Sequence, residues 1–187
     1  MDGIARAMVE GDRVLLRMPL EEDREAWAGL VAQSRSFVAP WIDLGDPEEG
    51  PGGYSAFGVM LGAVGDTRNL KMLVCLRESG EPIGVLNINE IVRGKFQSAY
   101  LGYWIGPAHA GQGLMSEALQ LALSHAFETL RLHRLEANLQ PDNEASRALV
   151  RRAGFIKEGY SERYLQVGGE WRDHERWAIT AERWRDR

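Results

Sequence analysis

The chain has 187 residues, of which 44% are hydrophobic and 26% are charged, and its formal net charge is −5. This length is enough for one domain with a full hydrophobic core, and the composition is typical of soluble globular proteins. The acidic balance argues against a broad nucleic-acid-binding surface. It suits a cationic substrate such as an amine or a basic peptide.

Cysteine usage and the N-terminal segment narrow the class of protein further. Cys75 is the single cysteine, which excludes an internal disulfide, and no cluster has the spacing of zinc ligands. We therefore expect no metal. The N-terminus is charged and mixed rather than a signal peptide, and no apolar run approaches the length of a membrane span. The sequence predicts a cytoplasmic protein and leaves its oligomeric state open.

The first third of the chain predicts one strand followed by helices. The apolar and capping patterns predict a strand over 13–17, a helix over 21–33 and a helix over 54–64. Between the helices, Phe37 and Trp41 lie in a segment that should not be regular helix across Pro40. These two aromatic side chains would either fill the core or line a pocket.

The rest of the chain predicts strands arranged around one long helix. The pattern gives antiparallel strands over 71–77, 82–92 and 98–105, a helix from 114, a strand over 133–138, a helix over 142–153 and a closing hairpin over 155–167 and 171–180. Because a helix joins strand 98–105 to strand 133–138, these two should be parallel. The sequence predicts a single α/β domain over residues 1–187, with a mostly antiparallel central sheet flanked by helices.

The connection between the central strand and the long helix is rich in glycine. It runs from Tyr100–Ile105 through Gly106-Pro107 and Gly111-Gln112-Gly113 into a helix at Leu114. The loop amides and the first helical turn have no internal partners, and the helix dipole favours negative charge there. Neither a Walker A motif nor a dinucleotide fingerprint is present. The turn is therefore either an anion site of another type or an ordinary tight strand-to-helix connection.

Several short motifs occur in an order that resembles the GNAT family of acetyl-CoA-dependent N-acetyltransferases. The motifs are Trp41 after Pro40, Val92-Arg-Gly94, Leu101-Gly-Tyr-Trp-Ile-Gly106, Gly111-Gln-Gly-Leu-Met115, Asn143-Glu-Ala-Ser146, Glu158-Gly-Tyr160 and Trp171-Arg-Asp-His174. Within the family, they look most like the group of ribosomal-protein alanine N-acetyltransferases that includes RimJ and RimL, and RimJ more than RimL. The resemblance covers nearly the whole chain and implies the GNAT fold, with a splayed parallel pair at the centre of the sheet.

The resemblance implies that the coenzyme diphosphate of acetyl-CoA lies on the amides of Ala108 to Leu114. Its pantetheine arm would lie where strand 100–105 parts from strand 133–138, with a bulge near Trp104 to produce the parting. The family often has Gln or Arg three residues before the first glycine and a basic residue just before it, whereas this chain has Ala108 and Ala110. The full implied set is Trp104, Ile105, Ala108, His109, Ala110, Gly111, Gln112, Gly113, Leu114, Met115, Asn138, Asn143 and Ser146.

Asn143 and Ser146 match the family's Asn-x-x-Ser at the start of the helix after the parted strand. By resemblance, Asn143 contacts the pantetheine or binds near it, and Ser146 lies by the coenzyme sulfur. The alternative is that the two residues are an ordinary helix cap and its third residue, which N-cap preferences support independently.

Acetyl transfer to an amine requires a deprotonated amine, a donor to the developing oxyanion and a proton for the leaving thiolate. A backbone amide near Trp104 or Ile105 is the oxyanion candidate. Ser146 is the expected proton donor to sulfur, with Tyr160 or Tyr103 as the fallback.

The general base is less well defined by the sequence. RimL-like relatives use a glutamate on the strand after the last helix, where this chain has Leu165. Glu162 and Glu90 are the available carboxylates on strands expected to face the cleft, either directly or through a water chain. The alternative for each is an exposed surface position.

The sequence therefore predicts transfer of an acetyl group to an N-terminal α-amine, by resemblance the alanine of a ribosomal protein. Phe37, Trp41, Tyr54 and Tyr103 are the expected substrate-binding residues. A small-molecule amine or amino-acid acetyltransferase of the same fold is the enzymatic alternative. A non-catalytic, ribosome-associated module that binds acyl-CoA is the non-enzymatic one, because the family acid is missing at Leu165.

Overall fold

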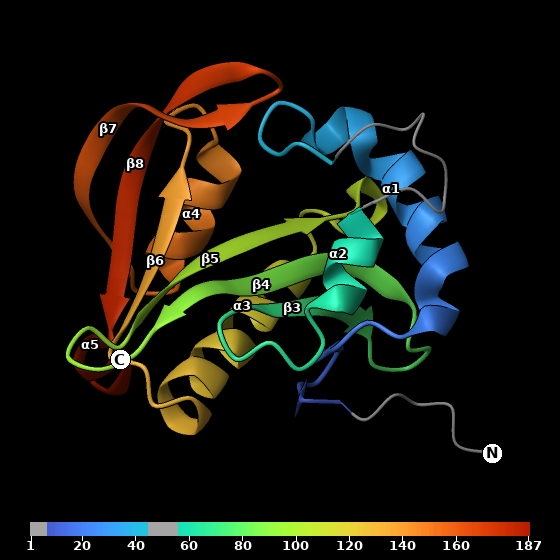
Figure 1. The fold of residues 1–187 in the computed structure, drawn as a ribbon, viewed down its shortest axis with the longest axis horizontal. Coiled ribbons are helices and arrows are strands. Elements are labelled where there is room, and N and C mark those ends of the chain that lie inside the picture. Colours follow the sequence, from blue (N-terminus) through green and yellow to red (C-terminus); the bar gives the residue numbers. More distant parts are fainter. Residues whose placement is uncertain (1–6, 45–55) are drawn as a thin grey trace.

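The centre of the structure is an eight-stranded sheet in the order β1-β2-β3-β4-β5-β6-β8-β7 (Figure 1). This computed structural model describes residues 7–44 and 56–187. The strands are β1 Val9–Glu10, β2 Val14–Arg17, β3 Leu70–Leu76, β4 Pro82–Val92, β5 Ser98–Ile105, β6 Arg134–Leu139, β7 Ile156–Val167 and β8 Glu170–Thr180. Neighbouring strands are antiparallel except for β5 and β6, which are parallel. The predicted mixed α/β fold with one parallel central pair is confirmed.

Helices cover both faces of the sheet. They are α1 Arg24–Val38, α2 Ala56–Gly62, α3 Leu114–Ser124, α4 Glu144–Arg152 and α5 Ala181–Arg185; a 3₁₀ turn, Glu21–Asp23, precedes α1, and a π-helical turn, His125–Thr129, continues α3. On one face, Trp27 of α1 and Phe57 of α2 pack with Trp104 of β5. On the other face, α3 and α4 bury their apolar sides in a larger core. No helix in the described ranges is both long and apolar enough to cross a membrane.

The end of helix α1 differs from the sequence prediction, and three further features of the fold were not predicted. Helix α1 continues past the predicted end to Val38, so that it stops just before Pro40. Strand β8 lies between β6 and β7, because the closing hairpin inserts its second strand next to β6. Strand β1 and helix α5 were not predicted, and both are too short for a clear periodic pattern.

The parallel pair at the centre of the sheet separates halfway along its length. Pairing between β5 and β6 ends at Leu101 and Ala137. Beyond that point β5 stays paired with β4 as far as Ile105, and β6 stays paired with β8 as far as Leu139. The two halves of the sheet therefore diverge, and the inner edges of β5 and β6 lose each other as hydrogen-bond partners.

The expected bulge near Trp104 is wrong. The register between β4 and β5 is continuous from Ile105 to Tyr100, and its shift lies at the opposite end of the pair, between Asn89 and Val92. Glu90, with a φ of 50°, lies in that shift. The separation of β5 from β6 instead follows from each strand keeping its outer neighbour.

A buried ion pair fixes the chain just before α1. Both nitrogens of the Arg17 guanidinium lie 2.6 Å from the oxygens of Asp23, and the two residues are 6% and 8% exposed. The backbone amide of Leu20 also donates to Asp23. Burial acts to raise the pKa of Asp23, but the hydrogen bonds from Arg17 and Leu20 outweigh it and hold that pKa below its usual value.

Substituting Asp23→Asn should lower the free energy of unfolding at pH 7 by about 3 kcal/mol, because it leaves the Arg17 charge buried without its partner. Urea denaturation measures this difference. A depressed carboxyl pKa stabilises the folded state fully above the usual pKa of about 4, so the wild-type advantage should shrink as the pH falls below that value. The exposed neighbour substitution Glu22→Gln is the control. Equal denaturation midpoints for the wild type and Asp23→Asn at pH 7 would contradict this role.

Candidate active site

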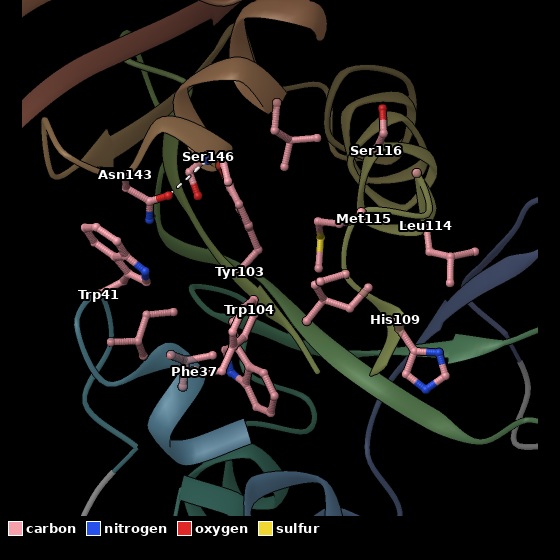
Figure 2. A pocket seen from close by; sticks show the side chains of 18 of the residues that line it. Phe37, Trp41, Tyr103, Trp104, His109, Leu114, Met115, Ser116, Asn143 and Ser146 are labelled. Atoms are coloured by element: carbon pink, nitrogen blue, oxygen red, sulfur yellow. Dashed lines mark hydrogen bonds between the residues drawn. The ribbon is translucent and has the colours of Figure 1, made fainter. Parts of the chain in front are cut away.

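A cavity of about 360 Å³ lies at the point where β5 and β6 separate. Its walls come from the end of α1, the second half of β5, the glycine-rich loop, the first turn of α3 and one face of α4 along its whole length. Figure 2 shows Asn143 and Ser146 on one side, Tyr103 and Met115 in the middle and His109 toward the other end. The cavity therefore connects the loop with the gap in the sheet.

The glycine-rich loop presents unpaired backbone donors to this cavity. Gly111 and Gly113 have φ values of 75° and 78°, in the left-handed region that favours glycine. Gly113 is the N-cap of α3, and no side chain in the described part of the chain caps that helix. The amides of the first turn, Leu114 to Ser116, are left without intrahelical acceptors, and the helix dipole adds partial positive charge. This geometry is suited to binding an anion.

Three side chains brace the loop from outside the cavity. The Nε2 atom of Gln112 donates to the carbonyl of Ala108 at 2.8 Å. Arg13 donates from Nη1 to the carbonyl of Gln112 at 3.0 Å, and its Nε lies 2.9 Å from Glu117 of α3. The Glu117 carboxylate also accepts from the backbone amides of Arg13 and Val14. The loop and the start of α3 are thus tied to the start of β2.

The separated edge of β5 offers a second set of donors. The Gly106 amide donates to Ile83 on the β4 side at 2.8 Å. Because successive amides of a strand point to opposite edges, the Trp104 amide also faces β4, whereas those of Tyr103 and Ile105 face the side that β6 has left. Of the two oxyanion candidates, Ile105 therefore has the suitable orientation and Trp104 does not.

Tyr103 places a hydroxyl group inside the cavity. This oxygen is buried and has no hydrogen-bond partner among the described residues. Burial raises the pKa of Tyr103 to about 12, and the nearby Ser146 hydroxyl only partly offsets this effect. The phenol is therefore neutral near pH 7 and acts as a hydrogen-bond donor into the cavity.

Asn143 combines both roles that the sequence left open. Its Oδ1 atom accepts from the Ser146 amide at 3.0 Å, so it is the N-cap of α4. Both residues also line the cavity. The cap therefore holds the Ser146 side chain at the cavity wall.

Most of the site residues expected from the sequence meet at this one cavity. Those that line it are Phe37, Trp41, Tyr103, Trp104, Ile105, His109, Ala110, Gly111, Gly113, Leu114, Met115, Asn143 and Ser146. Phe37 and Trp41 are therefore wall residues rather than core residues. Tyr54 lies outside the described residues.

Several other expected residues are not brought to the cavity. Glu90 is exposed in the register shift of β4, so strand alternation does not turn it inward. Glu162 is exposed within the register shift of β7, and Tyr160 donates to Asp173 on the outside of the same strand. No aspartate or glutamate occurs among the cavity-lining residues of the described chain.

Three further residues from the coenzyme set lie near the cavity without lining it. Ala108 is exposed on the outer side of the loop, and Gln112 braces the loop as described above. Asn138 lies on β6 at the separation of the strands. The first two could contribute backbone groups only.

Sequence reasoning missed cavity-lining residues on α1, α3 and α4 and in the segment just after α1. They are Val38, Ile42, Ser116, Ala145, Leu149 and Arg152. Ser146, Leu149 and Arg152 are spaced three apart and share one face of α4, which is a pattern that could have identified them. Arg152 is the only lysine or arginine that lines the cavity within the described residues.

Comparison with known proteins defines the family. Residues 13–156 match the acetyltransferase (GNAT) domain model, and the chain belongs to this family. It is 37% identical to the [ribosomal protein uS5]-alanine N-acetyltransferase of Escherichia coli over 188 residues, which cover 97% of this chain and 94% of that protein.

Solved structures agree with this assignment. Mycobacterium smegmatis RimJ in complex with CoA-disulfide is similar, with a TM-score of 0.83 and 34% identity, covering 90% of this chain and 82% of the other. RimL, a ribosomal L7/L12 alpha-N-protein acetyltransferase in complex with coenzyme A, has a TM-score of 0.78 and 25% identity, with 94% and 98% coverage.

Proposed function

We propose that this chain transfers the acetyl group of acetyl-CoA to the N-terminal α-amine of a protein, with alanine of a ribosomal protein as the favoured acceptor. One observation carries the proposal. A single cavity joins an uncapped helix N-terminus, which suits a diphosphate, to the gap between β5 and β6, which suits a thioester. Residues 1–187 would form one domain with this activity, since the sheet combines strands from both ends of the chain.

The residues present fit the coenzyme. The amides of Gly113 to Ser116 would hold its diphosphate, and the positive φ values of the two glycines keep side chains away from that surface. Ala108 and Ala110 of the loop carry no positive charge. Arg152 of α4 would supply that charge to the phosphates from the facing wall of the cavity. The Tyr103 hydroxyl, buried without a partner, provides a donor near the gap.

In the reaction, a C–N bond forms, the thioester C–S bond breaks, and one proton moves from the amine to the departing sulfur. Acetyl-CoA, when bound, supplies the activated acetyl group. The amides of Tyr103 and Ile105 would donate to the carbonyl oxygen as it becomes negatively charged.

The hydroxyls of Tyr103 and Ser146 would donate hydrogen bonds to the sulfur. A phenol with a pKa of about 12 stabilises a thiolate whose own pKa is about 8.5 without giving up its proton completely.

The absence of a cavity carboxylate within the described residues favours an acceptor that loses its proton easily. An α-amine has a pKa of about 8 and a lysine side chain one of about 10.4. At neutral pH the α-amine is therefore neutral about 10²-fold more often. This difference supports an N-terminal acceptor, which agrees with the activity named for the Escherichia coli relative. A ribosomal-protein acceptor would place the enzyme in the cytoplasm, as the sequence predicts.

The first test is an acceptor panel. A basic peptide that starts with alanine should release free coenzyme thiol from acetyl-CoA. Its kcat/KM should rise with pH to a plateau, with an apparent pKa of about 8 set by the acceptor. The same peptide with a blocked N-terminus and a free lysine should react about 10²-fold more slowly at pH 7.

Turnover confined to small amines would favour the alternative enzyme class. Coenzyme binding without turnover of any acceptor would favour an acyl-CoA-binding module.

Coenzyme binding is tested separately with Arg152→Gln. We expect the Kd for coenzyme A to rise about tenfold or more, because a hydrogen bond to a charged group contributes about 1.5–3 kcal/mol. Binding of pantetheine, which has no phosphate, should not change. The matched control is Arg151→Gln, an exposed neighbour outside the cavity. An unchanged Kd in Arg152→Gln would contradict this assignment.

The sulfur-side donor is tested with Tyr103→Phe, which removes one hydroxyl and keeps the ring. We expect kcat to fall about 10- to 100-fold with little change in the Kd of coenzyme A, at the lower end of the range for acid–base groups. Tyr160→Phe is the control, since that hydroxyl bonds to Asp173 on the surface. Equal losses of kcat in both variants would show that the cavity position of Tyr103 does not matter.

A further inference from the structure

We propose that Asn87 and Asn138 form the receptor for the acceptor amine, through their side-chain oxygens on the sheet face opposite α3 and α4. This inference rests on the proposed acetyl transfer. It names the side chains that hold the acceptor at the gap.

The strand register places the two asparagines on either side of Gly102. Asn87 of β4 is paired with Gly102 of β5. The last β5–β6 pair is Leu101 with Ala137, so Asn138 is the next residue across the gap from Gly102. Because side chains alternate along a strand, Asn87 and Asn138 share the face that also carries the Trp104 side chain. They lie where the strands begin to separate.

Both side-chain oxygens lack a protein partner. The Oδ1 atoms of Asn87 and Asn138 are buried, and neither has a hydrogen bond from any described residue. A buried acceptor without a donor is destabilising, so each such group calls for an explanation, and binding of an external donor is one. Two of them on one face, beside the gap in the sheet, point to the same external group.

Gly102 leaves room for one more group on this face of β5. Gly102 has no side chain, and a methyl group built there would have only the Nδ2 atom of Asn89 within 4 Å, at 3.4 Å. At the end of the gap, Gln140 donates to the carbonyl of Pro40 at 3.0 Å, which connects β6 to the segment that ends in Trp41. Trp41 lines the cavity. A ligand entering beside Trp41 would meet the two asparagines at the gap.

This face carries the cationic side chains of Lys71, Arg134 and Arg176. Lys71 pairs in register with Asn87, but its ammonium donates to Asn89 instead and leaves the Asn87 oxygen free. On the β6 side, Arg134 is bonded to Glu136 at 2.8 Å and also to Glu158. Arg176 pairs in register with Asn138, but its exposed guanidinium lies by Gly159 of β7 and the Asn138 oxygen accepts no hydrogen bond from it. The buried acceptors left beside the gap are two neutral oxygens, and their complement is a donor with at least two N–H bonds.

A primary amine is a donor of this kind, with two N–H bonds and a lone pair. Its N–H groups can donate to the two carboxamide oxygens while its lone pair faces the gap, where the Tyr103 and Ile105 amides lose their β6 partners. Neutral acceptors also orient the amine without holding its proton as strongly as a carboxylate would. The pair thus positions an α-amine for attack and leaves its deprotonation to the solvent.

The test uses the full chain with Asn87→Leu and Asn138→Leu. Each variant removes an unpaired oxygen and keeps side-chain volume, so we expect an unchanged or higher Tm, an unchanged Kd for coenzyme A and a KM for the acceptor peptide raised about tenfold. Asn87→Ala and Asn138→Ala repeat the measurement if leucine is not accommodated. Asn89→Leu is the matched control. It should lower Tm, because Asn89 is bonded to Lys71, without raising the acceptor KM.

The outcomes separate this inference from the proposed function. An active wild type with the same acceptor KM in all Asn87 and Asn138 variants would overturn the amine receptor alone. If the wild type uses a small primary amine but not the peptide, the peptide acceptor fails, and a raised KM for that amine in the variants supports the receptor. Turnover of neither acceptor would overturn both proposals.

Discussion

The site depends on the separation of β5 from β6 after Leu101 and Ala137. Beyond that point β5 stays hydrogen-bonded to β4, and β6 stays hydrogen-bonded to β8. Each strand therefore loses hydrogen bonds on one edge only. Gly84 lets β4 approach β5 closely, because a methyl group there would lie 2.4 Å from the Trp104 carbonyl. Trp104 in turn packs against Trp27 of α1. Packing thus holds the second half of β5 against β4 and α1, and its edge toward β6 stays without a strand partner.

The fold was predictable where local pattern and tertiary structure agree. Alternation gave β3, β4 and β5, and the glycine turn gave the start of α3 at Leu114, because these signals lie within a few residues of each other. The position of β8 between β6 and β7 was not predictable in this way. It depends on which strand of the hairpin pairs with β6, and that choice is made by long-range packing. The end of α1 was misplaced because Pro40, rather than the last periodic apolar residue, terminates the helix.

The candidate site was predictable along its backbone and less so in its side chains. The loop glycines and Asn143 act through local geometry, which a short motif records. Glu90 shows the limit, since strand alternation assigns it an inward direction only if the register is unbroken, and β4 shifts register there. Arg152 was missed because it reaches the cavity from α4, far in sequence from the glycine-rich loop. The side-chain oxygens of Asn87 and Asn138 can be recognised as buried and unpaired only from the hydrogen bonds of the folded structure.

In the proposed site, neutral donors and acceptors would orient the reactants, and the loop amides and Arg152 would bind the phosphates. The most direct test of this site is a titration of isotopically labelled protein with coenzyme A, in which NMR monitors the chemical shifts of the backbone amides. We expect the largest shifts at Gly111, Gly113, Met115 and Ile105. Saturating coenzyme that leaves these amides unshifted, or that shifts mainly amides remote from the loop and the separated edge of β5, would contradict the proposed site.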